Sequence, residues 1–93
     1  MDFEWDTIKA DSNLIKHGVS FEEAMTAFGD PRALTGYDPI HSIEEDRFLT
    51  MGLAINGQLL VVSHTDRGEN VRIISARAAT RREAKDYQDG NFP

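Results

Sequence analysis

The dipeptide Asn56-Gly57 limits the fold of this chain more than any other feature, because it joins two runs of β-type residues, 47–55 and 58–64. Asn-Gly is the pair best suited to a two-residue type I′ turn, since both residues tolerate a positive φ angle. Leu59 to Val62 are apolar at every position, which is typical of a central strand covered on both faces. The middle of the chain is therefore predicted to form an antiparallel hairpin.

Helix signals stand on both sides of this hairpin. Asp6 is placed to cap a helix that ends near Gly18, and Ser20 to Glu23 are spaced as a capping box that opens a second helix. Asp30-Pro31 ends this second helix, because the residue before proline is disfavoured in the α conformation. Thr80 to Glu83 form another capping box, which predicts a helix at the end of the chain.

The remaining segments complete an α+β arrangement. A turn at residues 66–70 precedes a third strand at 71–77, residues 33–37 are compatible with a further edge strand, and residues 38–46 have the composition of a loop. We predict one domain over residues 1–93, with two N-terminal helices, an antiparallel sheet of three to four strands and a C-terminal helix. Helices packed on one face would leave the other face of the sheet free to bind a ligand.

The composition predicts an intracellular location. The 93 residues include no cysteine, which excludes disulfides and thiolate metal sites and fits a reducing compartment. No apolar run approaches the roughly 20 residues of a membrane span, and the acidic N-terminus has the wrong charge for a signal peptide. We therefore expect a soluble, cytoplasmic protein without membrane association.

Positive charge is concentrated in the second half of an acidic chain. The net charge is −6, and residues 1–46 contain three basic and eleven acidic residues, whereas residues 47–93 contain seven basic and five acidic residues. Because the bulk charge opposes a nucleic acid, any polyanion site has to be local, and a cationic partner can dock on the acidic part. A solvated surface of mixed charge is the simpler alternative.

Arg67, Arg72 and Arg77 surround the second turn. Guanidinium groups fixed on a sheet are suited to phosphate, because their planar fork donates two parallel hydrogen bonds. Strict alternation along the strand places Arg72 and Arg77 on opposite faces. We therefore predict that Arg67 in the turn and Arg77 at the strand end clamp one phosphate. The alternative is that each arginine pairs with an acidic neighbour such as Asp66 or Glu69.

The segment 38–47 is a second candidate site. It contains His41, several carboxylates including Glu45, and Arg47, which together suffice for general acid–base catalysis beside an anion-binding group. Polar loops are also common without a catalytic role. His17, at a helix C-terminus, is most simply explained by the helix dipole, with catalysis as the alternative. The histidines lack ligand-like spacing and no Gly-rich phosphate loop occurs, so neither a metal nor a cofactor is predicted.

A series of motifs occurs along the chain in a characteristic order. They are Phe3-Glu4-Trp5-Asp6, Lys9-Ala10, Asn13, Lys16 to Ala24, Phe28-Gly29-Asp30-Pro31, His41-Ser42, Glu45-Asp46-Arg47, Thr65-Asp66-Arg67-Gly68 and Arg72 to Arg77. In this order and at this spacing they resemble the BrnT toxin family, and the resemblance extends from Phe3 to about Tyr87.

The resemblance implies a RelE-like fold and the activity of an endoribonuclease toxin in a type II toxin–antitoxin pair, which cleaves RNA without a metal. A BrnA-type antitoxin would neutralise the toxin in a hetero-oligomer and connect it to operator DNA only indirectly. Cleavage would begin with attack of the ribose 2′-hydroxyl on the phosphate, and it would leave a 2′,3′-cyclic phosphate.

The resemblance also implies roles for single residues. Arg67 and Arg77 match family arginines and would hold the negative charge of the transition state, with help from Arg47. Glu45 or His41 would act as the base or the acid, and the residues do not decide between the two.

Lys16 and His17 lie in a family motif and would contact the substrate together with Arg67, although helix capping also explains much of this motif. Two alternatives remain beside the free ribonuclease. One is an inactive module that binds an antitoxin and modulates DNA binding, which the acidic balance favours. The other is a nuclease that requires the ribosome.

Overall fold

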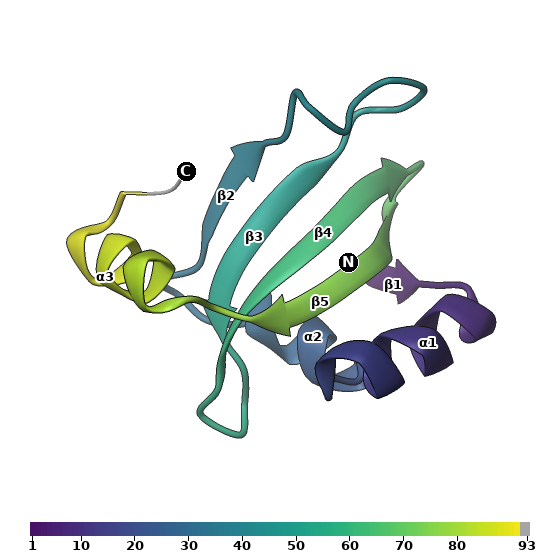
Figure 1. Ribbon diagram of the computed structural model, residues 1–93. Helices are drawn as coiled ribbons and strands as arrows, with labels where there is room; N and C mark the ends of the chain where they lie inside the picture. The colour runs from purple at the N-terminus through teal and green to yellow at the C-terminus, as the bar shows by residue number, and fades with distance from the viewer. Residues whose placement is uncertain (92–93) are drawn as a thin grey trace.

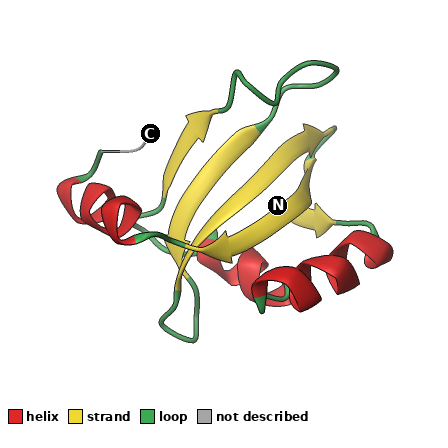
Figure 2. Ribbon diagram, in the orientation of Figure 1, coloured by secondary structure: helices red, strands yellow, loops and turns green. Residues whose placement is uncertain are grey.

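The computed structural model describes residues 1–91, and within this range the strands form a five-stranded mixed sheet in the order β1-β5-β4-β3-β2 (Figures 1 and 2). The strands are β1 (Asp2–Glu4), β2 (Leu34–Tyr37), β3 (Phe48–Leu53), β4 (Leu59–Arg67) and β5 (Asn70–Ala78). The helices are α1 (Thr7–His17), α2 (Phe21–Ala27) and α3 (Arg81–Asp89). None of these helices is long and apolar enough to cross a membrane.

The α+β class is confirmed, but the predicted sheet of three to four antiparallel strands is wrong. Residues 2–4 form an additional strand, β1, which pairs in parallel with β5. Three residues are too few for an alternating pattern to be recognised in the sequence. The expected edge strand at 33–37 is present as β2, and β4 occupies the predicted central position.

The β3–β4 turn has a different geometry from the one predicted. Ala54 donates its N–H to the Gln58 carbonyl at 2.8 Å and accepts from the Gly57 N–H at 2.9 Å, so the loop contains three residues. Gly57 has a φ of 88°, and no described residue other than glycine has a positive φ. Asn56 is therefore not in the left-handed conformation that a type I′ turn requires, and Gly57 alone supplies it.

The two N-terminal helices begin directly after the residues predicted to cap them, Asp6 and Ser20. Asp6 Oδ1 accepts from the Ile8 N–H at 2.8 Å, and Ser20 Oγ accepts from the Glu23 N–H at 3.0 Å. In the Ser20–Glu23 capping box, the Glu23 carboxylate does not bond the backbone N–H of Ser20. It accepts instead from the Asn56 side chain at 2.8 Å. This exchange ties α2 to the β3–β4 loop.

The core lies between the sheet and the helices α1 and α2 (Figure 1). Its buried members are Val19, Phe21, Ala24, Ala27, Ala54, Leu60, Val62, Ile73 and Ala76. Burial of each larger side chain contributes roughly 1.5–3 kcal/mol. A Cβ atom added at Gly52 would lie 2.4 Å from the Ala27 carbonyl oxygen, so only glycine lets β3 approach α2 this closely.

One buried side chain connects α1 to the sheet. Asn13 donates its amide N–H groups to the carbonyls of Val19 (2.9 Å) and Ala76 (2.8 Å), and its Oδ1 accepts from the Ala76 N–H at 3.1 Å. β1 pairs with β5 only at residues 70–72. Asn13 therefore bonds the backbone of β5 where β1 no longer covers it.

The helix α3 is separate from α1 and α2, contrary to the expectation that all helices cover one face (Figure 1). No residue of α3 is buried, and both halves of the capping box of Thr80 and Glu83 are present. The Tyr87 hydroxyl donates to Asp30, and the Arg32 guanidinium lies 5.3 Å from the centre of the Tyr87 ring. Polar contacts of this kind, rather than an apolar face, hold α3 in place.

Candidate functional site

A β-bulge in β5 decides which side chains share a face of the sheet. Ser63 lies opposite Ser75, but the next residue of β4, His64, lies opposite Ile73, so that Ile74 is an additional residue. The additional residue shifts the alternation by one position, and Arg72 therefore lies on the same face as Arg77. The prediction that alternation separates these two arginines is wrong for this reason.

The face opposite α1 and α2 carries the three arginines of the hairpin. We call it the open face and define it by Ser63, Arg67, Arg72, Ser75 and Arg77. Arg77 lies opposite Val61, six residues before Arg67, so the two arginines are roughly 20 Å apart along the hairpin. The structure does not bring Arg67 and Arg77 together, and a clamp of both around one phosphate is not formed.

Arg77 is engaged at the end of the sheet where α3 begins. Its guanidinium donates to both carboxylate oxygens of Glu83, at 2.7 and 2.9 Å. These bonds from Arg77 lower the pKa of Glu83 to about 2, and the Thr80 N–H adds to the effect. The same pair raises the pKa of Arg77. Arg77 therefore fixes the first turn of α3.

Arg72 is engaged at the edge of the sheet. Its Nη1 donates to the Glu4 carboxylate at 3.2 Å, and the Asn70 amide donates to the same carboxylate at 3.4 Å. Glu4 is the last residue of β1, directly beside Arg72 in the parallel pair. The pair therefore fastens the short strand β1 to β5.

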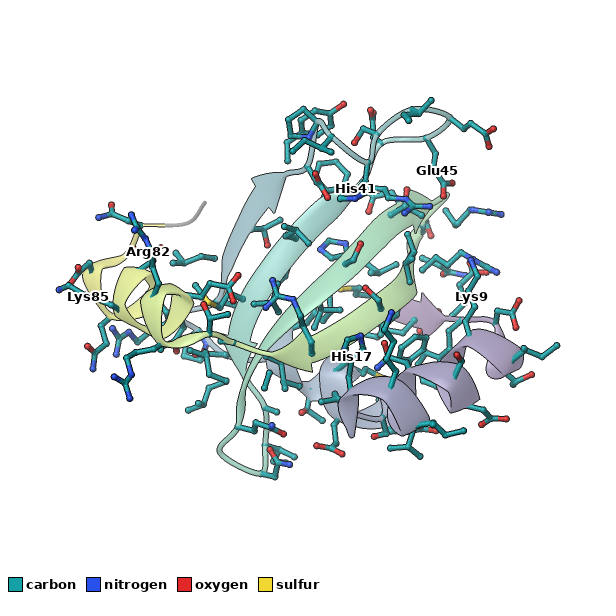
Figure 3. All side chains as sticks on the ribbon, in the orientation of Figure 1. Lys9, His17, His41, Glu45, Arg82 and Lys85 are labelled. Carbon is teal, nitrogen blue, oxygen red and sulfur yellow. The ribbon has the colours of Figure 1, made fainter. Side chains whose placement is uncertain are left out.

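Arg67 has the loosest contact of the three. Its Nη2 lies 3.9 Å from Glu45 Oε2, and the two side chains are 53% and 38% exposed. The partner is part of the loop 38–47, which lies beyond the opposite end of the sheet from α3 (Figure 3). All three arginines thus have carboxylate neighbours, as the simpler alternative expected, although the partners are Glu45, Glu4 and Glu83 instead of residues in the turn.

The loop 38–47 is held by internal hydrogen bonds. Ser42 Oγ donates to the Asp38 carbonyl at 2.5 Å and accepts from the Arg47 N–H at 2.9 Å. Thr65 of β4 donates its hydroxyl to the Asp46 carbonyl at 2.5 Å. Because these bonds connect both ends of the loop to each other and to β4, the residues between them have a defined position over the end of the sheet.

This loop surrounds a hollow of about 300 Å³. The residues that line it are Ile40, His41, Ile43, Glu44, Glu45 and Arg47. His41 Nδ1 lies 2.8 Å from Asp38 Oδ2, so a carboxylate orients the imidazole. Arg47 Nε is buried without a hydrogen-bond partner in the described range. The structure thus brings His41, Glu45 and Arg47 together, with Arg67 beside Glu45.

Two predicted residues lie elsewhere. Lys16 and His17, at the end of α1, line a separate hollow between α1 and β5. Sequence reasoning named Lys9 only as part of a family motif and not as a site residue. Lys9 lines the same hollow, and its spacing of seven residues from Lys16 indicates one helix face. Sequence reasoning also did not single out Asp38 as the partner of His41, although a separation of three residues in a turn permits the contact.

His64 is a structural residue. It is 6% exposed, its Nε2 lies 2.7 Å from Thr50 Oγ1, and its ring stacks on Phe48 and meets the edge of Phe28. Burial lowers the pKa of His64, so the neutral imidazole is the form that fits the core. Within residues 1–91, no group of three His, Asp or Glu side chains has an arrangement suited to a metal ion.

The arrangement of the sheet and helices is similar to that of a small ribonuclease toxin. The crystal structure of the Brucella abortus ribonuclease toxin, BrnT, matches with a TM-score of 0.59 and 25% sequence identity, over 87% of this chain and 99% of that one. The sequence model described as ribonuclease toxin, BrnT, of type II toxin-antitoxin system matches residues 5–83. The chain belongs to this BrnT family. A comparison with curated proteins finds no significant match.

Proposed function

We propose that the protein is a metal-independent endoribonuclease that cleaves RNA at the hollow of the loop 38–47. The observation that carries this proposal is the convergence of an oriented His41, Glu45 and Arg47 in one hollow, with Arg67 exposed at its side. A base, a second acid–base group and two permanent cations are what phosphoryl transfer from RNA needs.

The reaction would use these groups in a defined order. One of His41 and Glu45 removes the proton of the ribose 2′-hydroxyl, whose oxygen then attacks the adjacent phosphorus. Arg67 and Arg47 stabilise the charge of the pentacovalent phosphorane. The other acid–base group protonates the departing 5′-oxygen, which leaves a 2′,3′-cyclic phosphate and a 5′-hydroxyl end.

The loose pair of Arg67 and Glu45 supports this role for Arg67. An exposed ion pair at 3.9 Å contributes at most about 1 kcal/mol, so a phosphate can replace Glu45 at little cost. Arg77 would have to give up two short hydrogen bonds to Glu83 to do the same. We therefore assign the substrate contact to Arg67, and we assign Arg77 to the attachment of α3.

The partner of a type II toxin is a protein antitoxin, and we propose that a BrnA-type antitoxin forms a hetero-oligomer with this chain. Contact with DNA would then be indirect, through the antitoxin. The likeness to RelE-like toxins and a requirement for the ribosome stay predictions.

The test is cleavage of RNA in the presence of EDTA by the unmodified protein and by the single variants Arg67→Ala and Arg77→Ala. We expect cyclic-phosphate products that persist in EDTA, and a much larger loss of rate for Arg67→Ala. Arg82→Ala on α3 is the matched control, because it removes the same charge from an exposed position. Equal rates for all four proteins would contradict the assignment of Arg67.

A second candidate function is an inactive, antitoxin-binding module. The carboxylate neighbours of all three arginines favour it, because they reduce the positive potential of the open face. Expression of the chain alone decides between the two. Growth arrest with degradation of cellular RNA would contradict the inactive module, whereas normal growth together with stable binding of an antitoxin would support it.

A further inference from the structure

The lysines of α1 differ from the arginines of the open face in their electrostatic surroundings. Lys9 and Lys16 are both exposed, and neither forms an ion pair within the part of the chain that the structure describes. Each arginine has to release a carboxylate before it can bind an external anion. The two lysines do not, so their charge is directly available.

Their position on α1 is fixed by the helix period. Lys9, Asn13 and Lys16 are four and three residues apart, and they therefore lie on one face of the helix. Asn13, between the two lysines, is buried and bonded to the backbone of Ala76 at 2.8 and 3.1 Å. This anchor holds the lysine-bearing face against β5, with one lysine a turn before it and the other a turn after it. The lysines are about 10 Å apart along the axis.

A hollow of about 190 Å³ lies between this helix face and β5. It is lined by Lys9, Ser12, Asn13, Lys16, His17, Ile74 and Ser75. None of these residues is acidic, in a protein whose net charge is −6. The lining offers two ammonium groups and two hydroxyl groups, which is the set of donors that a phosphate monoanion accepts from.

The β-bulge connects the hollow to the open face. Ile74 is the additional residue of the bulge, and Ser75, the next residue, lies on the open face opposite Ser63. Ser63 is four residues before Arg67, which corresponds to about 13 Å along β4. An extended strand that crosses the open face from Arg67 therefore reaches the hollow within a short length.

We propose that this hollow is a subsite for a backbone phosphate of single-stranded RNA, held by Lys9 and Lys16. The proposal rests on the proposed function, since it takes RNA as the substrate and places the strand between this subsite and the loop 38–47. Lysine binds phosphate as a point charge and does not read the base, so the subsite positions the strand without selecting its sequence.

The test measures binding apart from cleavage. A fluorescein-labelled single-stranded RNA with 2′-O-methyl groups lacks the hydroxyl nucleophile, so it is not cut by 2′-hydroxyl attack. Its affinity is measured by fluorescence anisotropy for the unmodified protein and for the double variant Lys9→Ala, Lys16→Ala. We expect affinity to fall about tenfold at low salt. We also expect the slope of log affinity against log salt to become shallower by about 0.7, because the subsite neutralises one phosphate of a single strand.

The matched control is the double variant Arg82→Ala, Lys85→Ala, which removes the same charge from exposed positions on α3. We expect its affinity to stay within about twofold of the unmodified protein. An equal loss in both double variants would show a bulk charge effect and overturn the proposal, as would no loss in either. A defect of the α1 variant in antitoxin binding, with unchanged RNA affinity, would assign the hollow to the protein partner and also overturn it.

Cleavage of ordinary RNA separates this subsite from the proposed function. For the α1 double variant we expect a higher KM with an unchanged kcat, because the subsite binds the strand away from the reacting phosphate. If the unmodified protein binds the 2′-O-methyl RNA through α1 but cuts no RNA, the proposed function fails and the subsite stands. If it cuts RNA and the α1 variant has an unchanged KM, the subsite fails alone.

Discussion

The two ends of the β4–β5 hairpin present similar arginines in different chemical situations. At one end, Arg77 donates two short hydrogen bonds to Glu83 and holds α3. At the other end, Arg67 is half-exposed and lies 3.9 Å from Glu45, beside the hollow of the loop 38–47. The comparison shows that a guanidinium on a sheet face is not by itself evidence of a phosphate site, because its nearest carboxylate decides whether it is free to bind one.

The largest effect that we expect distinguishes the two ends by activity. Arg67→Ala should lower the rate of RNA cleavage by about 100- to 1,000-fold, because a donor aimed at the developing charge of the phosphorane is lost. Arg77→Ala should lower it by less than about tenfold. Initial rates on one RNA substrate in EDTA measure both. A loss of equal size for Arg77→Ala would place both ends of the hairpin in one catalytic site.

The second prediction distinguishes the two ends by stability. Arg77→Ala should lower the free energy of unfolding by about 1–2 kcal/mol, because it leaves Glu83 without its bidentate donor and loosens α3. Arg67→Ala should change this free energy by less than about 0.5 kcal/mol. Urea denaturation of both variants, followed by far-UV circular dichroism, gives the two values, and the reverse order would contradict the structural role of Arg77.

The third prediction concerns acid, to which Glu83 at the Arg77 end and the buried His64 of β4 respond in different pH ranges. Burial lowers the pKa of His64 below its reference value of 6.5. The contribution of neutral His64 to the free energy of unfolding is therefore complete above pH 6.5, and it declines as the pH falls below that value. The pKa of Glu83 is about 2 in the folded protein, against 4.5 for an unperturbed glutamate. The contribution of ionised Glu83 to the free energy of unfolding is therefore complete above pH 4.5 and is lost between pH 4.5 and about 2.

Thermal melts at a series of pH values measure this difference. Glu83→Gln should flatten the decline of Tm below pH 4.5 and leave the range from pH 6.5 to 5 unchanged. His64→Gln should flatten the decline of Tm that begins below pH 6.5, since the amide can still reach Thr50 without becoming charged. A single decline that both variants affect equally would show that Glu83 and His64 do not titrate separately.

The smallest expected effect tests the loose pair itself. Glu45→Gln removes the carboxylate that competes with RNA for Arg67, and it should raise the affinity for 2′-O-methyl RNA by about two- to threefold. The same variant sharpens the assignment of the base. If its cleavage rate stays within about threefold, His41 is the base, whereas a loss of about 100-fold or more would assign that role to Glu45.

The sequence was sufficient for the local features of the fold and insufficient for the relations between strands. The caps at Asp6 and Thr80 were predictable because each involves residues close together in the chain. The face of Arg72 was not predictable, because the bulge at Ile74 exists only in the pairing of β5 with β4. Likewise, β1 is too short to show a period, and it is a strand only because β5 accepts it as a neighbour.

For the candidate site, composition and spacing indicated the loop 38–47, and the structure places His41, Glu45 and Arg47 around one hollow. The predicted clamp of Arg67 and Arg77 is not formed, because the two residues lie far apart along the hairpin. A local sequence pattern does not reveal this distance. The roles of His41, Glu45, Arg47 and Arg67 in cleavage stay predictions.

Asn13 has a consequence for how this chain behaves among copies of itself. An uncovered strand edge is a template for pairing with another chain, and β1 leaves the second half of β5 uncovered. The amide of Asn13 offers Ala76 the same donor and acceptor that a neighbouring strand would offer. Asn13 therefore blocks pairing of another strand at Ala76, and Asn13→Leu should make concentrated solutions form oligomers, which size-exclusion chromatography would detect.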